Sequence, residues 1–112
     1  MKVTLGVSSR EDINKRVITA SEGKAQGEFI SFESPELLFK TLSAKRWDIL
    51  KVMTGAGPVS IRKASRMLKR DVKAVHRDIH VLLDTGILQK TDEGQIIFPY
   101  DAIHVDFMVE AA

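Results

Sequence analysis

The sequence predicts a mixed α+β fold, and three observations lead to this prediction. Segments that alternate apolar and polar residues, as half-buried strands do, lie near both ends of the chain. Between them, apolar residues recur at helical spacing and are separated by capping residues, glycine and proline. Charge is also unevenly divided: residues 60–80 hold seven Lys or Arg against two Asp, whereas residues 84–112 hold one Lys against six Asp or Glu.

Length and composition narrow the class of protein. A chain of 112 residues is long enough for one hydrophobic core and far too short for a protein kinase. Because cysteine is absent, a disulfide, a thiolate zinc site and a cysteine nucleophile are all excluded. No apolar window is long enough to span a membrane, and the N-terminus lacks the apolar core of a signal peptide. We therefore expect a cytoplasmic protein with no membrane partner.

Residues 1–33 are predicted to form a strand–helix–strand extension, a candidate element for dimerisation or partner binding. KVTLGV at 2–7 predicts a strand, and EFISF at 28–32 predicts a second one. Between them, Ser8 or Ser9 can cap a helix that ends near Gly23.

Two helices, or one bent helix, are expected next. Ser34 caps the first, and Pro35 lies in its first turn, where a missing N–H costs nothing. Ser43 or Ala44 opens the second, which the GAGP run at 55–58 ends. The apolar residues of these segments are Leu37, Leu38, Leu42, Trp47, Leu50 and Met53.

A further helix pair and three strands complete the prediction. Ser60 caps a helix over 61–68, and after a turn of about three residues Asp71 caps another that ends before Gly86. The expected inward residues are Ile61, Ala64 and Leu68 in the first helix, and Val72, Val75, Ile79, Leu82 and Leu83 in the second. A hairpin is expected from strands 87–91 and 95–100 around a turn at 91–94. The last strand, 102–109, would place Ile103, Val105, Phe107 and Val109 on one apolar face.

Two short helices joined by a tight turn and followed by a hairpin are the order of a winged helix-turn-helix, predicted here for residues 34–112. A helical wheel places Lys73, Arg77 and the incoming Arg70 opposite the apolar stripe, with Ala74 between them. The alternative is an ordinary solvated helix face. Because the seven cations are confined to the helices that would contact nucleic acid, we expect binding to double-stranded DNA.

A family resemblance rests on the same residues. PVSIRKASRMLKRDVKAVHRDIHVLLDTGILQKT at 58–91 resembles the winged helix-turn-helix of small bacterial and archaeal transcription factors of the MarR and ArsR type. With FISFESPELLF, KRWDIL and PYDAIHVDF added, the chain more closely resembles a family of small predicted prokaryotic transcriptional regulators, some of them antitoxins. The resemblance implies a homodimer that regulates transcription from its own operator. The alternatives are an antitoxin that binds a partner toxin and autoregulates its operon, and a protein that binds RNA.

By position, the resemblance implies DNA contacts at the start of the second helix and phosphate contacts at the start of the first. The DNA-contact candidates on the second helix are Lys73, Ala74, His76 and Arg77, and the phosphate candidates on the first are Ser60 and Arg62. The other candidate DNA-binding residues are Lys63, Arg66, Lys69, Arg70 and Lys90. His76 has a second interpretation, as a semi-buried neighbour of the core. Asp92 and Glu93 stand at the hairpin turn where a phosphate-gripping wing has Arg or Lys, which argues against minor-groove insertion.

The stretch VHRDIH at 75–80 also contains fragments of two enzyme motifs. H-R-D belongs to a kinase catalytic loop, but position 83 is Leu rather than the required Asn. The zinc-protease motif H-E-x-x-H needs Glu where Arg77 stands. We therefore expect no enzyme, no catalytic residue and no cofactor. A structural or sensing metal at His76 and His80, with or without His104, is the remaining alternative, since ArsR-type relatives use such sites.

Overall fold

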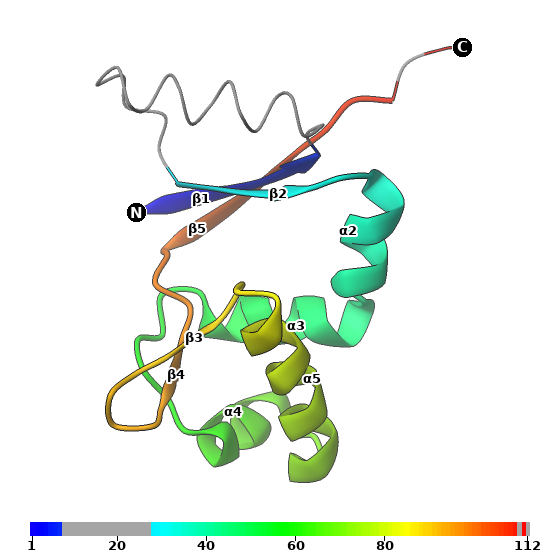
Figure 1. Cartoon of the computed structure of the whole chain (residues 1–112). Coiled ribbons are helices and arrows are strands. Elements are labelled where there is room, and N and C mark those ends of the chain that lie inside the picture. The colour runs from blue at the N-terminus through cyan, green and yellow to red at the C-terminus, as the bar shows by residue number, and fades with distance from the viewer. Residues whose placement is uncertain (8–27, 110, 112) are drawn as a thin grey trace. The chain divides into compact units, whose positions relative to one another are not determined.

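The computed structural model describes residues 1–7, 28–109 and 111. Within these residues the chain forms four α-helices, a three-stranded parallel sheet and a two-stranded hairpin (Figure 1), which confirms the mixed α+β class. The helix predicted after Ser8 or Ser9 lies outside the described residues. The chain divides into two compact units, one of Met1–Lys40 with Ala102–Ala112 and the other of Thr41–Asp101.

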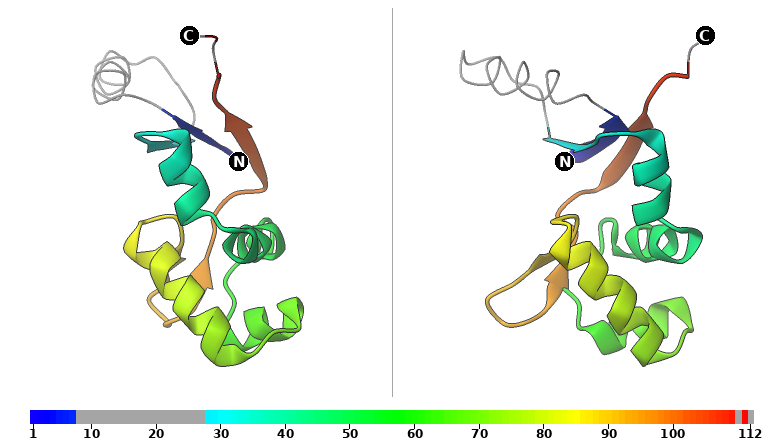
Figure 2. Two further views of the ribbon diagram at one scale, coloured as in Figure 1. Left: turned by 90° about the vertical axis from the view of Figure 1, so that its right-hand side faces the viewer. Right: turned by 45° about the vertical axis from the view of Figure 1, so that its right-hand side comes forward.

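The first unit is built on the parallel sheet, whose strands have the order β2-β1-β5 (Figure 2). They are β1 (Lys2–Val7), β2 (Glu28–Phe32) and β5 (Ala102–Asp106). As the central strand, β1 buries Val3 and Leu5 completely. The strands predicted from the alternation in KVTLGV and EFISF are thus confirmed.

The last strand differs from its prediction in length, in burial and in the unit to which it belongs. β5 stops at Asp106 and pairs in parallel with β1. The predicted apolar face is only partly covered, since Val105 is 43% exposed and Val109, which lies beyond β5, is 83% exposed. The ring of Phe107 meets that of Phe39 edge-on at 5.7 Å. Because β5 pairs with β1, it belongs to the first unit, whereas the sequence grouped it with the preceding helices.

Gly6 of β1 has no room for a side chain between the two neighbouring strands. A Cβ atom there would stand 2.7 Å from Cζ of Phe29 and 2.8 Å from the backbone oxygen of Asp106. The Phe29 ring can turn away, but the Asp106 oxygen is fixed in the paired β5 strand. We therefore expect Gly6→Ala to lower the free energy of unfolding by about 1–3 kcal/mol, measured by urea denaturation. A change below about 0.5 kcal/mol would contradict this close approach.

The two predicted helices after residue 33 are separate. α2 (Pro35–Thr41) begins at the predicted proline, and Ser34 Oγ accepts a hydrogen bond from the Leu37 N–H at 3.1 Å. α3 (Ala44–Met53) starts three residues after α2 ends. Ser43 precedes α3 but makes no side-chain capping hydrogen bond.

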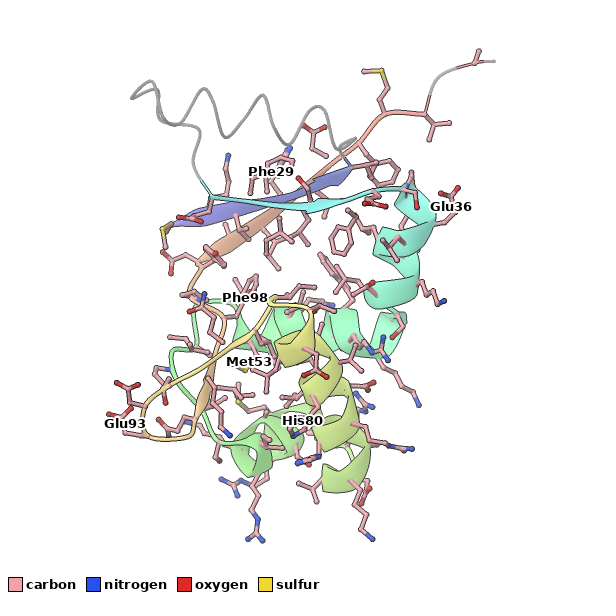
Figure 3. All side chains as sticks on the ribbon, viewed as in Figure 1. Phe29, Glu36, Met53, His80, Glu93 and Phe98 are labelled. Atoms are coloured by element: carbon pink, nitrogen blue, oxygen red, sulfur yellow. The ribbon has the colours of Figure 1, made fainter. Side chains whose placement is uncertain are left out.

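The second unit contains α3, α4 (Ile61–Leu68), α5 (Val72–Asp84) and a hairpin of β3 (Gln89–Lys90) and β4 (Ile96–Ile97). Its core is made by apolar residues from each of the three helices and from the hairpin region; Figure 3 labels Met53 and Phe98 among them. The fully or nearly fully buried residues are Ile49, Leu50, Met53, Val59, Ala64, Val75, Ile79, Leu82, Ile87, Leu88, Ile96 and Phe98.

The hairpin is confirmed, but its strands are much shorter than predicted. The Ile87 and Leu88 N–H groups both donate to the Leu82 carbonyl at 3.0 Å, so they close the end of α5 instead of joining a ladder. Pro99 has no N–H to donate on the other side. Val59, which precedes α4, forms an additional antiparallel bridge to Ile96.

None of the helices in the described ranges is long and apolar enough to cross a membrane.

Candidate nucleic-acid interface

α4 begins and ends as its sequence predicts, and its cations are exposed. Ser60 Oγ accepts a hydrogen bond from the Lys63 N–H at 3.0 Å. Lys69 ends the helix in the left-handed conformation, with φ of 54°. Ala64 is buried, whereas Ile61 and Leu68 are only half-buried. The exposed residues of the α4 segment that were predicted to contact DNA are Ser60, Arg62, Lys63, Arg66 and Lys69.

Ser65 is a buried polar residue that the sequence interpretation missed. Its hydroxyl donates to the Arg70 carbonyl, and the Arg70 N–H donates to the Ser65 carbonyl at 3.2 Å. These two hydrogen bonds fix the turn between α4 and α5. The sequence signal for the burial of Ser65 was its position next to Ala64, on the inward side of α4.

α5 begins at its predicted cap. The Asp71 carboxylate accepts hydrogen bonds from the Lys73 N–H at 3.1 Å and the Ala74 N–H at 3.4 Å. Lys73 and Arg77 are exposed, and Ala74 is half-buried. Val75, Ile79 and Leu82 are buried on the other side of the helix. The predicted opposition of a cationic face and an apolar stripe is therefore confirmed.

Val72 corrects the predicted limits of that stripe. The sequence placed Val72 in the core, but it is 40% exposed. It is the first residue of α5, and burial begins one turn later at Val75. Val72 instead lines a surface hollow of about 820 Å³ with residues of α4 and α5. The other lining residues are Ile61, Arg62, Asp71, Lys73, His76 and Arg77.

Asp78 lies between two arginines from different parts of the second unit. Its Oδ1 is 3.2 Å from Arg46 Nε on α3, and its Oδ2 is 3.0 Å from Arg70 Nη2 in the turn. Arg46 also donates from Nη1 to the Thr41 carbonyl at 3.2 Å. The three charged side chains are only 19–24% exposed. Asp78 therefore ties α5 to α3 and to the turn that precedes it.

This arrangement differs from the expectation for Arg70. Arg70 was a predicted DNA-binding residue, but its guanidinium is paired with Asp78, and its Nη1 is buried without a partner among the described residues. Arg70 therefore lies at the edge of the cationic face, where its ion pair with Asp78 stabilises the fold.

His76 is exposed, so its interpretation as a semi-buried neighbour of the core is wrong. Its Nε2 lies 3.1 Å from Nε2 of His80, one turn along α5. His104 lies on β5, in the other unit. In the described part of the chain, no group of three or more His, Cys, Asp or Glu residues could hold a metal ion.

The hairpin turn carries acidic side chains, with one cation beside it. Asp92 and Glu93 are both exposed, and Figure 3 labels Glu93 at this turn. Gly94 closes the turn with φ of 80°, and the Thr91 N–H donates to the Gln95 carbonyl at 2.8 Å. Lys90, the predicted cation of the hairpin, is exposed at the end of β3. The turn therefore presents carboxylates, which repel phosphate.

One protein-family model matches the part of the chain that contains these helices. A model of the HVO_A0114 family matches residues 41–105, more than half of the chain. The chain belongs to the HVO_A0114 family. The HVO_A0114 match contains α3, α4, α5, the hairpin and most of β5. No curated protein and no solved structure matches the chain.

Proposed function

We propose that this HVO_A0114 family protein is a transcriptional regulator that binds specific double-stranded DNA sequences through a winged helix-turn-helix. α5 is its recognition helix in the major groove, and α4 lies across the phosphate backbone. The observation that carries the proposal is the exposed cationic face of α5, Lys73 and Arg77, opposite a buried apolar stripe. That geometry lets the helix pack on the protein while it presents cations outward.

The order of elements in the second unit supports the same proposal. α4, a short turn, α5 and the β3–β4 hairpin follow one another, and Val59 before α4 bridges to Ile96 of β4. The turn is fixed by the Ser65–Arg70 hydrogen bonds, and α5 is held to α3 by Asp78. A fixed helix is required for base reading, because contacts to base edges depend on the register of the side chains.

The exposed candidates of α5 and of the α4 segment each have a role in the proposal. Arg77 and Lys73 donate to base edges, with Arg77 suited to the bidentate contact that guanidinium makes with guanine. His76 also faces the groove from α5. On α4, the exposed side chains of Ser60, Arg62, Lys63, Arg66 and Lys69 bind phosphates and set the register. The carboxylates at the hairpin turn keep the wing out of the minor groove.

A homodimer is part of the proposal, and the first unit is its proposed dimerisation element. Six of the exposed large apolar side chains are in that unit: Met1, Leu37, Phe39, Val105, Met108 and Val109. Contacts between copies would remove this apolar surface from water. The same surface also fits the antitoxin alternative, in which a partner toxin covers it. Sedimentation of the protein expressed alone separates the two, because a stable lone dimer favours the regulator.

The proposal is tested by selecting bound duplexes from a random DNA pool with the whole chain. We expect enrichment of a two-fold symmetric site with half-sites about one helical turn apart. Equal retention of all duplexes, or stronger retention of single-stranded or duplex RNA, would contradict sequence-specific DNA binding.

A further inference from the structure

His76 and His80 are one turn apart on α5, and each directs Nε2 at the other. The two Nε2 atoms are 3.1 Å apart, and the ring centroids are 4.2 Å apart. Both side chains are exposed, and Figure 3 labels His80 on α5. We propose that these two imidazoles form a bidentate site for a divalent late transition-metal ion of the copper(II), nickel(II) and zinc(II) class.

The separation of the two nitrogens fits such an ion. Imidazole nitrogens bind these metals at about 2.0–2.1 Å, so an ion equidistant from nitrogens 3.1 Å apart makes an N–metal–N angle of about 95–102°. This angle lies between the right angle of a square-planar site and the wider angle of a tetrahedral one. Without metal, one Nε2–H can donate to the other Nε2, with the roles set by the tautomers. Metal binding needs both rings in the Nδ1–H tautomer, so that each Nε2 lone pair is free. The helix therefore already holds the two ligand nitrogens at a chelating distance.

The donor atoms beside the pair select the kind of ion. The hollow beside the pair is also lined by the cations Lys45, Arg46, Arg70 and Arg77 and by Asp78, whose oxygens are bound to two of the arginines. Calcium and magnesium ions depend on free carboxylate and carbonyl oxygens, which this surface does not offer them. Ions that prefer imidazole nitrogen bind despite the nearby positive charge, and copper(II) binds most tightly of the three.

The site is open as well as small. No third protein ligand joins the pair in the described residues, so water fills the other coordination positions. Two coordinated nitrogens on one rigid helix still bind far better than one, because the second nitrogen binds intramolecularly. The metal site does not depend on the proposed DNA binding, since it is measured on the free protein.

The test is a copper(II) titration of the whole chain by calorimetry, with electron paramagnetic resonance recorded at one equivalent. We expect one tightly bound ion per chain and a spectrum with two coordinated imidazole nitrogens. His76→Gln and His80→Gln should each weaken binding about a hundredfold through loss of chelation. The matched control is His104→Gln, because His104 is the third and last histidine of the chain and lies exposed on β5. Its affinity for copper should equal that of the wild type.

A wild-type affinity in His80→Gln, a loss in His104→Gln, or the absence of a bound ion would overturn the proposal. Circular dichroism of each variant checks that α5 is intact. A second readout needs no variant: in the wild-type protein, copper should broaden the imidazole NMR signals of both His76 and His80. Signals of either histidine that stay sharp at one equivalent of copper would also overturn the proposal.

Discussion

Asp78→Asn is expected to lower the free energy of unfolding by about 2–3 kcal/mol, because it leaves two largely buried arginines without their counter-charge. Arg46 and Arg70 meet separate oxygens of Asp78 at 3.2 and 3.0 Å. An amide keeps the shape of the carboxylate but presents only one oxygen and no charge. The buried Nη1 of Arg70 already lacks a partner among the described residues, so this arginine has little further compensation available. Urea denaturation followed by circular dichroism measures the loss.

The same substitution on the same helix gives a matched control. Asp84 is the last residue of α5 and is exposed. Asp84→Asn should change the stability by less than about 0.5 kcal/mol. A double-mutant cycle with Arg46→Gln adds a second check, since Arg46→Gln should cost less in the Asp78→Asn background than in the wild type. Equal stability of the Asp78→Asn and Asp84→Asn proteins would contradict the role of Asp78 as the link between α3, the turn and α5.

Arg77→Ala is expected to weaken binding to the selected duplex by about 1–3 kcal/mol while leaving stability unchanged. Arg77 is exposed on α5, opposite Val75 and Ile79, so its removal leaves no cavity. A fluorescence anisotropy titration measures the affinity, and thermal unfolding measures the stability. Lys51→Ala on α3 is the matched control, because Lys51 is an equally charged, exposed residue that lines neither hollow beside α5. An operator affinity within twofold of wild type in Arg77→Ala would contradict the recognition-helix assignment.

Local signals in the sequence predicted the helices of the second unit well. A serine or aspartate followed by helical periodicity identifies a helix start because the side-chain oxygen accepts backbone N–H groups within the next turn. Ser60 and Asp71 do so in the structure. Gly86 follows α5 with φ of 84°, a conformation that glycine adopts without strain. The cationic face of α5 was predicted for the same reason, since helical geometry alone places Lys73 and Arg77 opposite the apolar stripe.

Contacts between residues that are far apart in the sequence could not be predicted from local sequence patterns. Asp78 pairs with Arg46, 32 residues earlier, and no periodicity connects the two. The parallel pairing of β5 with β1 brings together opposite ends of the chain. The hairpin strands are short because the N–H groups of Ile87 and Leu88 bond to the Leu82 carbonyl and therefore do not pair with the other strand. Val72 is exposed because burial along α5 begins one turn later, at Val75. The spacing of apolar residues along the helix does not predict where that burial begins.

Base reading by α5 is tested by comparing Arg77→Ala with Lys63→Ala on two duplexes. Dissociation constants are measured for the selected duplex and for a scrambled one at several salt concentrations. We expect Arg77→Ala to lose affinity for the selected duplex alone. Lys63→Ala should instead weaken both duplexes equally and reduce the salt slope by about one. Equal losses on both duplexes in Arg77→Ala would show that α5 contributes charge alone, and would contradict its role as the recognition helix.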